Sequence, residues 1–410
     1  MGILSRAFGS AEGEKALSII DLIKGTDAYR PTFSGKSVTV ESAVRVSTVF
    51  ACMRVLGEGV AQVPLKLMRQ DIKTRTRLPA YNHPLFDLLA YSPNGWQTSF
   101  EFREQIVWHA GLTGNAFIFV NRNGQGDVLE LIPLAPGAVT VKQSKDWALS
   151  YTFKNERGEQ RDIPAEAMWH IRGPSLNGFQ GLDCVKIARE AIGLSMAIED
   201  SQATMHKNGT KPSGVYSVDS TLKPDQWRSL RDWIVEQTGG SENAGKPMVL
   251  DRAAKWMQTS MSNIDAQTLE TRRYQVEEVC RFARVNPIMV GAESKNTTYA
   301  SAEQMFLAHV VHTLAPWFQR IEQSIDKNLL SEADRRNGIY SNFVEEGLLR
   351  GSAVTTKDVL LGYVNGGMMT ANEGRGMLDL NPDSSPESDK LRVPANIVGL
   401  GDHTDERQDA

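Results

Sequence analysis

The chain has 410 residues, 41% of them hydrophobic, and 45 basic against 49 acidic side chains leave a net charge of −4. This length allows about two or three domains, and the apolar share argues against a mainly disordered chain. The near-neutral charge excludes a strongly basic nucleic-acid coat, although local basic patches remain possible. The cysteines Cys52, Cys184 and Cys280 lie far apart in the sequence. We therefore predict no disulfide framework, and expect buried thiols in a reducing compartment.

Membrane insertion and secretion are not predicted. The two best uncharged runs, residues 105–121 and 304–319, fall short of the ~20 apolar residues that a spanning helix needs. The first residues lack an apolar core followed by a small-residue cleavage site, so they do not form a signal peptide. We expect a protein made and kept in the cytoplasm, with no membrane partner.

The first half of the chain predicts an α+β domain. Residues 1–36 are small, polar and mixed, which indicates a flexible N-terminal arm. Apolar residues three to five apart predict a helix over residues 44–63, ended by Pro64. Further helices are expected over residues 83–90 and 99–112, the second with Ser99 as its N-cap. Short runs of β-branched and aromatic residues between turn signals predict antiparallel strands at 65–69, 116–121, 128–132, 139–143, 151–154 and 168–172.

The second half predicts three long helices. The first covers residues 184–208 with an inner stripe of Ile187, Ala191, Leu194 and Ile198, and the second covers residues 265–284. Between them lies a compact insert with strands at 214–218, 248–250 and 255–259 and a helix at 223–237. The third helix, residues 300–330, has the clearest apolar periodicity in the chain: Leu307, Val311, Leu314, Phe318, Ile321, Ile325 and Leu329.

Pro316 lies in the middle of this third helix, where it removes one backbone hydrogen bond and crowds the carbonyl of His312, so a kink is predicted there. A strand over residues 339–344 and helices over 355–365 and 371–378 follow. Residues 383–410 contain seven acids and three bases with several Pro, Ser and Gly. That composition predicts a disordered tail.

One motif suggests nucleotide binding. Residues 240–246 match GxxxxGK, the loop that cradles phosphates. The next residue is Pro247, where a Mg²⁺-binding Ser or Thr is required, and the loop follows a helix rather than a strand. A flexible glycine-rich turn is the better interpretation. No other pattern supports catalysis, and no metal ion or cofactor is predicted.

Two further features suggest assembly surfaces. Trp227 and Trp233 share a short helix with Arg228 and Arg231, and exposed Trp and Arg are common interface anchors, although ordinary core packing remains an equal alternative. The polar loop 292–299 joins two long helices. It is either an idle connector or a finger that touches a polyanion.

In order and spacing, the chain resembles the portal proteins of long-tailed, lambda-like bacteriophages over residues 37–383. Each matching segment is weak alone, and the combination carries the resemblance. The segments include Val46-Ser47-Thr48-Val49-Phe50-Ala51-Cys52, His83-Pro84-Leu85-Phe86-Asp87-Leu88-Leu89, Gly114-Asn115-Ala116-Phe117, Leu131-Ile132-Pro133-Leu134, Asn208-Gly209-Thr210-Lys211-Pro212-Ser213-Gly214, Asp265-Ala266-Gln267-Thr268-Leu269-Glu270-Thr271-Arg272 and Thr313-Leu314-Ala315-Pro316-Trp317.

The resemblance implies an α+β portal fold in a ring, usually of twelve subunits, at one capsid vertex, with double-stranded DNA passing through its centre. The implied parts follow chain order. They are a flexible arm (1–36), a wing (37–183, completed by 300–350), two stem helices (184–211 and 261–291), a clip (212–260), a tunnel loop (292–299), a long kinked helix (300–330), a crown (352–383) and a disordered tail (384–410).

The resemblance also implies partners and sites. The clip docks the terminase large subunit and later the head–tail connector, and the ring contacts the major capsid protein. We expect the clip surface to contain Gln226, Trp227, Arg228, Arg231 and Trp233. We expect the DNA channel and tunnel loop to contain Lys295, Asn296, Thr297, Thr298, Tyr299, Arg272 and Arg273. The helix 265–284 carries four bases and four acids, which suits a conduit that must not grip its cargo.

The resemblance places the protein in the virion, at the capsid portal vertex, and in the host bacterial cytoplasm during assembly. Two other hypotheses remain beside the portal ring. One is an enzyme that uses the 240–246 loop on a nucleotide, and the other is a capsid scaffold that does not contact DNA.

Overall fold

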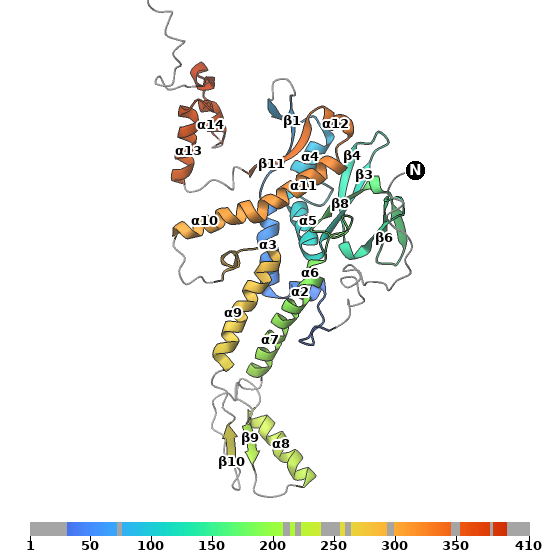
Figure 1. The fold of residues 1–410 in the computed structure, drawn as a ribbon, viewed down its shortest axis with the longest axis vertical. Coiled ribbons are helices and arrows are strands. Elements are labelled where there is room, and N and C mark those ends of the chain that lie inside the picture. The colour runs from blue at the N-terminus through green and yellow to red at the C-terminus, as the bar shows by residue number, and fades with distance from the viewer. Residues whose placement is uncertain are drawn as a thin grey trace, which may run out of the picture. The chain divides into compact units, whose positions relative to one another are not determined.

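The structure, a computed structural model, is shown in Figure 1. The residues that it describes are 31–71, 76–207, 214–217, 223–238, 255–258, 264–292, 299–345, 353–377 and 380–391. Contacts divide the chain into two compact units, residues 1–297 with 311–343 and residues 298–310 with 344–410, and each is described by itself. No helix in the described ranges is long and apolar enough to cross a membrane.

The larger unit begins with a helical layer around α3 (Ser47–Ala61). A short helix, α2 (Val40–Val44), precedes it under a Thr39 cap, and the predicted helix over residues 44–63 corresponds to α3, which begins three residues later. α3 packs against α5 (Ser99–Thr113). The predicted apolar face is confirmed for Val49, Met53, Leu56 and Val60, which are all buried, whereas Val44 is half-buried and belongs to α2.

The helix starts follow local capping chemistry. α4 (Pro84–Ala90) begins after His83, whose ring nitrogen accepts from the Leu85 amide. The N-cap of α5 is Thr98, which forms a full capping box with Glu101. The prediction of Ser99 as the cap is therefore wrong. Ser99 is the first helical residue, and its hydroxyl donates to the Leu89 carbonyl instead.

Two antiparallel sheets follow the helical layer. The first has the order β4 (Val128–Leu134), β3 (Asn115–Arg122) and β8 (Met168–Arg172). The second has the order β5 (Val139–Gln143), β6 (Leu149–Lys154) and β7 (Gln160–Ile163). Phe117, Tyr151 and Met168 form a buried cluster between them. The predicted strands are confirmed, but β7 was missed because its polar, exposed residues carry no apolar alternation.

A third sheet joins distant parts of the chain. β11 (Ile339–Phe343) pairs with β1 (Leu65–Gln70), which also pairs with the short β2 (Arg77–Pro79). Phe318 of α11 (Ala315–Asn328) stacks on Phe343 with ring centroids 4.8 Å apart. The predicted strand at 339–344 thus completes the first domain from the far end of the sequence.

Two long helices contact each other in the larger unit (Figure 1). α6 (Cys184–Ile187) leads into α7 (Arg189–Lys207), and α9 is Ile264–Ala283. The predicted inner stripe of α7 is wrong. Within one chain Ile187 is 56% exposed and Leu194 is 41% exposed, and Ile192 is the buried residue.

The chain start is more ordered than predicted over residues 31–36. Thr32 is buried against Gly193, where an added Cβ would lie 2.7 Å from the threonine side chain. The Phe33 amide donates to Glu190 at 3.0 Å, and Lys36 pairs with Asp200. These contacts hold this part of the predicted flexible arm on α7; the rest of the arm lies outside the described residues.

The insert between the long helices keeps three described elements. They are β9 (Gly214–Ser217), α8 (Pro224–Thr238) and β10 (Lys255–Gln258), with β9 and β10 antiparallel. These match three of the predicted elements. The predicted strand at 248–250 lies outside the described residues.

The predicted third helix contains an irregular turn. α10 (Tyr299–His309) is followed by a π-helical segment, η7 (Val310–Leu314), before α11 begins. Helical residues run without a break from Tyr299 to Asn328, so the long helix is confirmed. Pro316 lies in the first turn of α11, directly after the π-helical turn, and the kink at the proline stays a prediction. Ser331 then caps the short α12 (Glu332–Arg336).

The smaller unit contains α13 (Ala353–Asn365) and α14 (Ala371–Met377). The 3₁₀ helix η9 (Pro386–Asp389) packs on α14, where Asn372 donates to Asp389 at 2.7 Å. Ser388 is buried and donates to Asp383. The tail predicted as disordered is therefore structured over residues 384–391, because Asp389 has a partner on α14 and Ser388 has one in Asp383.

Candidate assembly and channel segments

The point where α6 leaves the sheet is a close contact between glycines. A Cβ at Gly181 would lie 1.8 Å from the Gly114 carbonyl oxygen, and one at Gly114 would lie 1.9 Å from the Leu182 oxygen. Gly114 also ends α5 at φ 73°, in the left-handed region. Its carbonyl accepts from the Gly173 amide at 2.7 Å. Only glycine lets the end of α5, the end of β8 and the start of α6 meet here.

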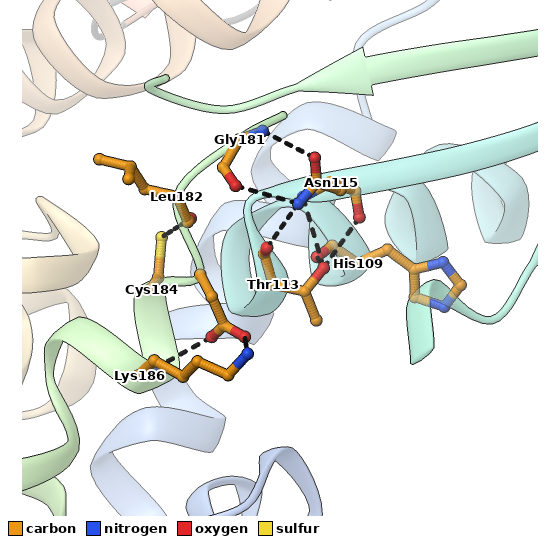
Figure 2. Close-up of polar contacts among 8 residues, drawn as sticks. His109, Thr113, Asn115, Gly181, Leu182, Cys184 and Lys186 are labelled. Carbon is orange, nitrogen blue, oxygen red and sulfur yellow. Dashed lines mark hydrogen bonds and ion pairs between the residues drawn. The ribbon is translucent and has the colours of Figure 1, made fainter. Parts of the chain in front are cut away.

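Asn115 connects the same three segments through its side-chain amide, and Figure 2 shows its contacts with Thr113 and Gly181. Its Nδ2 donates to the carbonyls of Thr113 and Gly181 at 2.9 and 3.2 Å. Its Oδ1 accepts from the Gly181 amide at 2.8 Å and from His170 Nε2 at 3.0 Å. All the polar capacity of this buried side chain is therefore used at the junction.

His170 is the buried partner of Asn115 on β8. The Asn115 oxygen can only accept, so the imidazole carries its proton on Nε2, and Nδ1 faces the Tyr151 hydroxyl at 3.4 Å. Burial, with a smaller contribution from Arg172, lowers the pKa of His170 to about 3. The ring is therefore neutral at physiological pH and serves as a structural hydrogen-bond bridge.

Asp183 then sets the start of α6. Its carboxylate accepts from the Lys186 amide at 3.0 Å and lies 3.3 Å from the Lys186 ammonium. Cys184 donates to the Leu182 carbonyl at 3.7 Å, and Figure 2 shows these groups directly beside the Asn115 network. Sheet and helix are thus joined by a fixed polar junction, which sets the exit direction of α6.

The α7 and α9 pair is held by polar contacts as well as apolar ones. Ser195 donates to the buried Gln275 at 3.3 Å, and Arg272 donates to Gln202 at 2.7 Å. Arg272 was predicted as a channel residue; it is exposed and also links the two helices. Arg273, the neighbouring prediction, is exposed on α9.

Charge along the C-terminal half of α9 is internally balanced. Arg281 pairs with Glu278 and lies 3.6 Å from Glu277, and its guanidinium also stacks 5.2 Å from the Tyr274 ring centroid. The hydrogen bond to the Tyr274 hydroxyl, with smaller contributions from Glu278, raises the pKa of Arg281. The guanidinium of Arg281 therefore interacts with three side chains of its own helix.

The predicted tunnel loop is mostly outside the described residues. This holds for Lys295, Asn296, Thr297 and Thr298, while Tyr299 is the first residue of α10. The grouping of these residues with Arg272 and Arg273 therefore stays a prediction. The glycine motif at 240–246 also lies outside the described residues.

α8 carries the predicted clip residues on its surface. Trp227 is 54% exposed and Trp233 is 39% exposed, which decides against complete burial of either indole in this chain. The Arg231 guanidinium lies 5.4 Å from the Trp227 ring centroid. Gln226 accepts from the Lys223 amide at 3.1 Å at the helix start, and Arg228 lies 3.9 Å from Asp225. Trp227 and Arg231 are thus grouped, and Gln226 has a local capping role.

No group of three or more His, Cys, Asp or Glu side chains in the described part of the chain is arranged to hold a metal ion. Sequence reasoning missed the Asn115–His170–Gly181 junction as a unit. The sequence indicated this junction only through Gly114-Asn115, which is part of one segment that resembles portal proteins. Nothing in the spacing linked it to residues 55 and 66 positions away.

Comparison with known proteins agrees with this architecture. The family described as phage portal protein matches residues 47–379. The portal protein of Enterobacteria phage HK97 is 28% identical over 89% of this chain and 85% of its own length. The probable portal protein of Streptomyces phage phiC31 is 28% identical over 98% of this chain and 90% of its own. This chain therefore belongs to the phage portal protein family.

A solved structure supports the fold. A chain from the neck of a native gene transfer agent particle, computed with C12 symmetry, has a TM-score of 0.57 and 21% identity. The match covers 89% of this chain and 99% of that chain. The α+β portal fold predicted from the sequence is thus confirmed.

Proposed function

We propose that copies of this chain form a ring, of twelve subunits, at one capsid vertex, and that double-stranded DNA passes through its centre during packaging and ejection. Family membership supports the portal role, and the twelve-fold symmetry of the related particle neck supports the subunit number. The observation that carries the proposal is a pair of exposed apolar side chains on the first long helical segment. Ile187, the last residue of α6, and Leu194, on α7, lie seven positions apart and are not covered by the described part of the chain.

A second copy is the occupant that this face requires. Apolar side chains in series on a helix are normally buried, and a ring covers them by heterologous contacts between neighbours. Within the single chain two members of the predicted inner stripe, Ile187 and Leu194, are exposed. In the proposed ring, the same residues are the seam between adjacent stem helices.

The channel role is supported by the charge pattern of α9. Arg281 is neutralised by Glu277 and Glu278, so few cations are free to hold phosphates. Each phosphate contact adds a salt-dependent increment to affinity, and a balanced wall lets DNA slide. We propose Arg272, Arg273 and the tunnel loop Lys295, Asn296, Thr297, Thr298 and Tyr299 as the nearest contacts with DNA.

The parts of the chain receive portal roles in the same proposal. The wing is 37–183 completed by 300–350, the stem is α6 with α7 and α9, and the crown is 352–383. The clip is 212–260, and the exposed Trp227 and Trp233 beside Arg228 and Arg231 support it as a docking surface for the terminase large subunit and the head–tail connector. The major capsid protein surrounds the ring. The chain acts as a structural component of the virion and not as an enzyme, and it assembles in the host cytoplasm.

Electron microscopy of the purified full-length protein tests the ring. We expect annular particles with a central hole, with twelve-fold symmetry in class averages and a matching mass by native mass spectrometry. A monodisperse monomer at all salt and protein concentrations would refute the proposal. Deleting residues 295–299 should leave rings intact and impair packaging, and normal packaging by that deletion would remove the proposed loop role.

A further inference from the structure

Two buried cysteines meet where α3 contacts α9. Cys52 Sγ and Cys280 Sγ lie 3.8 Å apart, although 228 positions separate the residues in the chain. Both side chains are almost completely buried, at 0% and 1% exposed. The two thiols are in van der Waals contact with each other, and the sulfurs must approach to about 2.05 Å to form a covalent bond.

We propose that Cys52 and Cys280 are a redox pair, which stays as thiols in a reducing cell interior and is converted by a peroxide into a disulfide that fastens α9 to α3. The pairing of the two thiols rests on their contact, and the stage at which they are oxidised rests on the proposed role in a phage particle. The bacterial cytoplasm keeps thiols reduced, so the disulfide is expected only outside the cell.

The chemistry is a two-step oxidation. The Cys280 thiolate attacks one peroxide oxygen, which breaks the O–O bond and gives a sulfenic acid and hydroxide. The Cys52 sulfur then attacks the Cys280 sulfur, forming the S–S bond and expelling a second hydroxide. The two hydroxides take up the two protons that the thiols release. Both sulfurs are oxidised, and one hydrogen peroxide is reduced to two waters.

The arrangement assigns different roles to the two thiols. The hydrogen bond between them, together with burial, raises the pKa of Cys52, and the same bond lowers the pKa of Cys280. Within the proposal Cys280 is therefore the thiol that loses its proton more readily and attacks first. A small oxidant reaches the pair when the α3–α9 packing opens locally.

Cys184 is a natural control within the same chain. Its thiol donates to the Leu182 carbonyl, and it is only partly buried at the start of α6. It has no sulfur partner among the described residues. If solvent exposure alone decided which thiol is oxidised, Cys184 would react first. Selective oxidation of Cys52 with Cys280 would therefore show that the proximity of the two thiols decides.

Peptide mapping of the full-length protein tests the proposal. Protein purified with dithiothreitol is freed of reductant, treated with hydrogen peroxide, blocked with N-ethylmaleimide, digested and analysed by mass spectrometry. We expect one cross-linked species joining the Cys52 and Cys280 peptides, lighter by two hydrogens than their sum and lost on reduction. Free thiols should fall from three per chain to one.

Matched variants complete the test. Cys184→Ala should keep the cross-link, whereas Cys280→Ala should lose it and leave Cys52 as a thiol or higher oxide. The wild-type map decides even where a variant fails to fold. The proposal is overturned if peroxide leaves both thiols free, yields sulfinic acid at either without a cross-link, or joins Cys184 to one of them.

Discussion

The backbone carbonyl of Gly114 occupies the space that a side chain at Gly181 would need. An added Cβ at Gly181 lies 1.8 Å from that oxygen, and the residues are 67 positions apart in the sequence. Around this contact Asn115 and His170 satisfy each other's polar atoms. The start of α6, and with it the direction of α7, is thus set by a polar junction at the sheet edge.

Replacing Gly181 with alanine should destabilise the larger unit by about 3 kcal/mol or more, because the clashing atom belongs to the backbone and cannot rotate away. Thermal or urea unfolding of the purified protein measures the loss. Gly137→Ala is the matched control, since an added Cβ there meets nothing within 4 Å. Equal stability of the two variants would contradict the packing argument.

The buried His170 predicts acid sensitivity. The folded protein keeps the ring neutral down to a pKa of about 3, whereas the unfolded chain takes up the proton near the ordinary value of 6.5. The unfolded state therefore binds more protons between these pH values, and the free energy of unfolding falls as pH is lowered from about 6.5 towards 3. The expected loss from this group is about 2 kcal/mol at pH 5.

Thermal unfolding at a series of pH values from 7.5 to 4 checks this. His170→Gln should have a shallower acid dependence than the native protein, although it is less stable at pH 7. His312→Gln, at an exposed position on η7, should keep the native pH profile. Parallel profiles for the native protein and His170→Gln would refute the assignment.

The proposed ring seam predicts the effect of a charge on the exposed face of α7. Leu194→Glu should lower the fraction of chains in rings at least about tenfold, which corresponds to ~1.4 kcal/mol, because each interface must bury an unpaired carboxylate. Native mass spectrometry and electron microscopy measure the ring fraction. Glu199→Gln, also on the exposed surface of α7, is the control and should assemble normally. Undiminished assembly of Leu194→Glu would exclude this face from the seam.

The arginines of α9 predict a difference in the salt dependence of DNA binding. Arg272→Gln and Arg273→Gln should each weaken binding of the ring to double-stranded DNA. Each should also make the plot of log affinity against log salt concentration less steep. The magnitude of its slope should fall by about one for each phosphate contact that the ring loses. Arg281→Gln should change the slope less, because Arg281 is paired with Glu277 and Glu278. Filter-binding titrations between low and moderate salt measure the slopes, and a larger effect at Arg281 would reverse the proposed assignment.

The predictions that rest on local sequence patterns were the most reliable. The buried face of α3 and most of the strands followed from the spacing of apolar residues, because such periodicity is a property of the backbone geometry itself. The prediction of the N-cap of α5 was less reliable, since Thr98 and Ser99 are adjacent candidates. Only their contacts with Glu101 and Leu89 distinguish them.

Errors in the sequence predictions arose where no local pattern identifies the groups that surround a residue. Apolar spacing predicted that Leu194 is buried, but in the single chain it is exposed. The spacing does not identify which surface would cover it. Composition marked residues 384–391 as disordered, yet Ser388 and Asp389 find partners in the same unit. Polar residues become ordered when specific acceptors and donors are brought to them.

The sequence alone determined the α+β class, the order of helices and strands and, through the spacing of its motifs, membership of the portal family. The tertiary structure decided which distant groups meet: Gly114 with Gly181, Asn115 with His170, and Cys52 with Cys280. The physical reason is that secondary structure depends on interactions a few residues apart. Steric exclusion, buried hydrogen bonds and thiol contacts depend instead on how the whole chain folds back on itself.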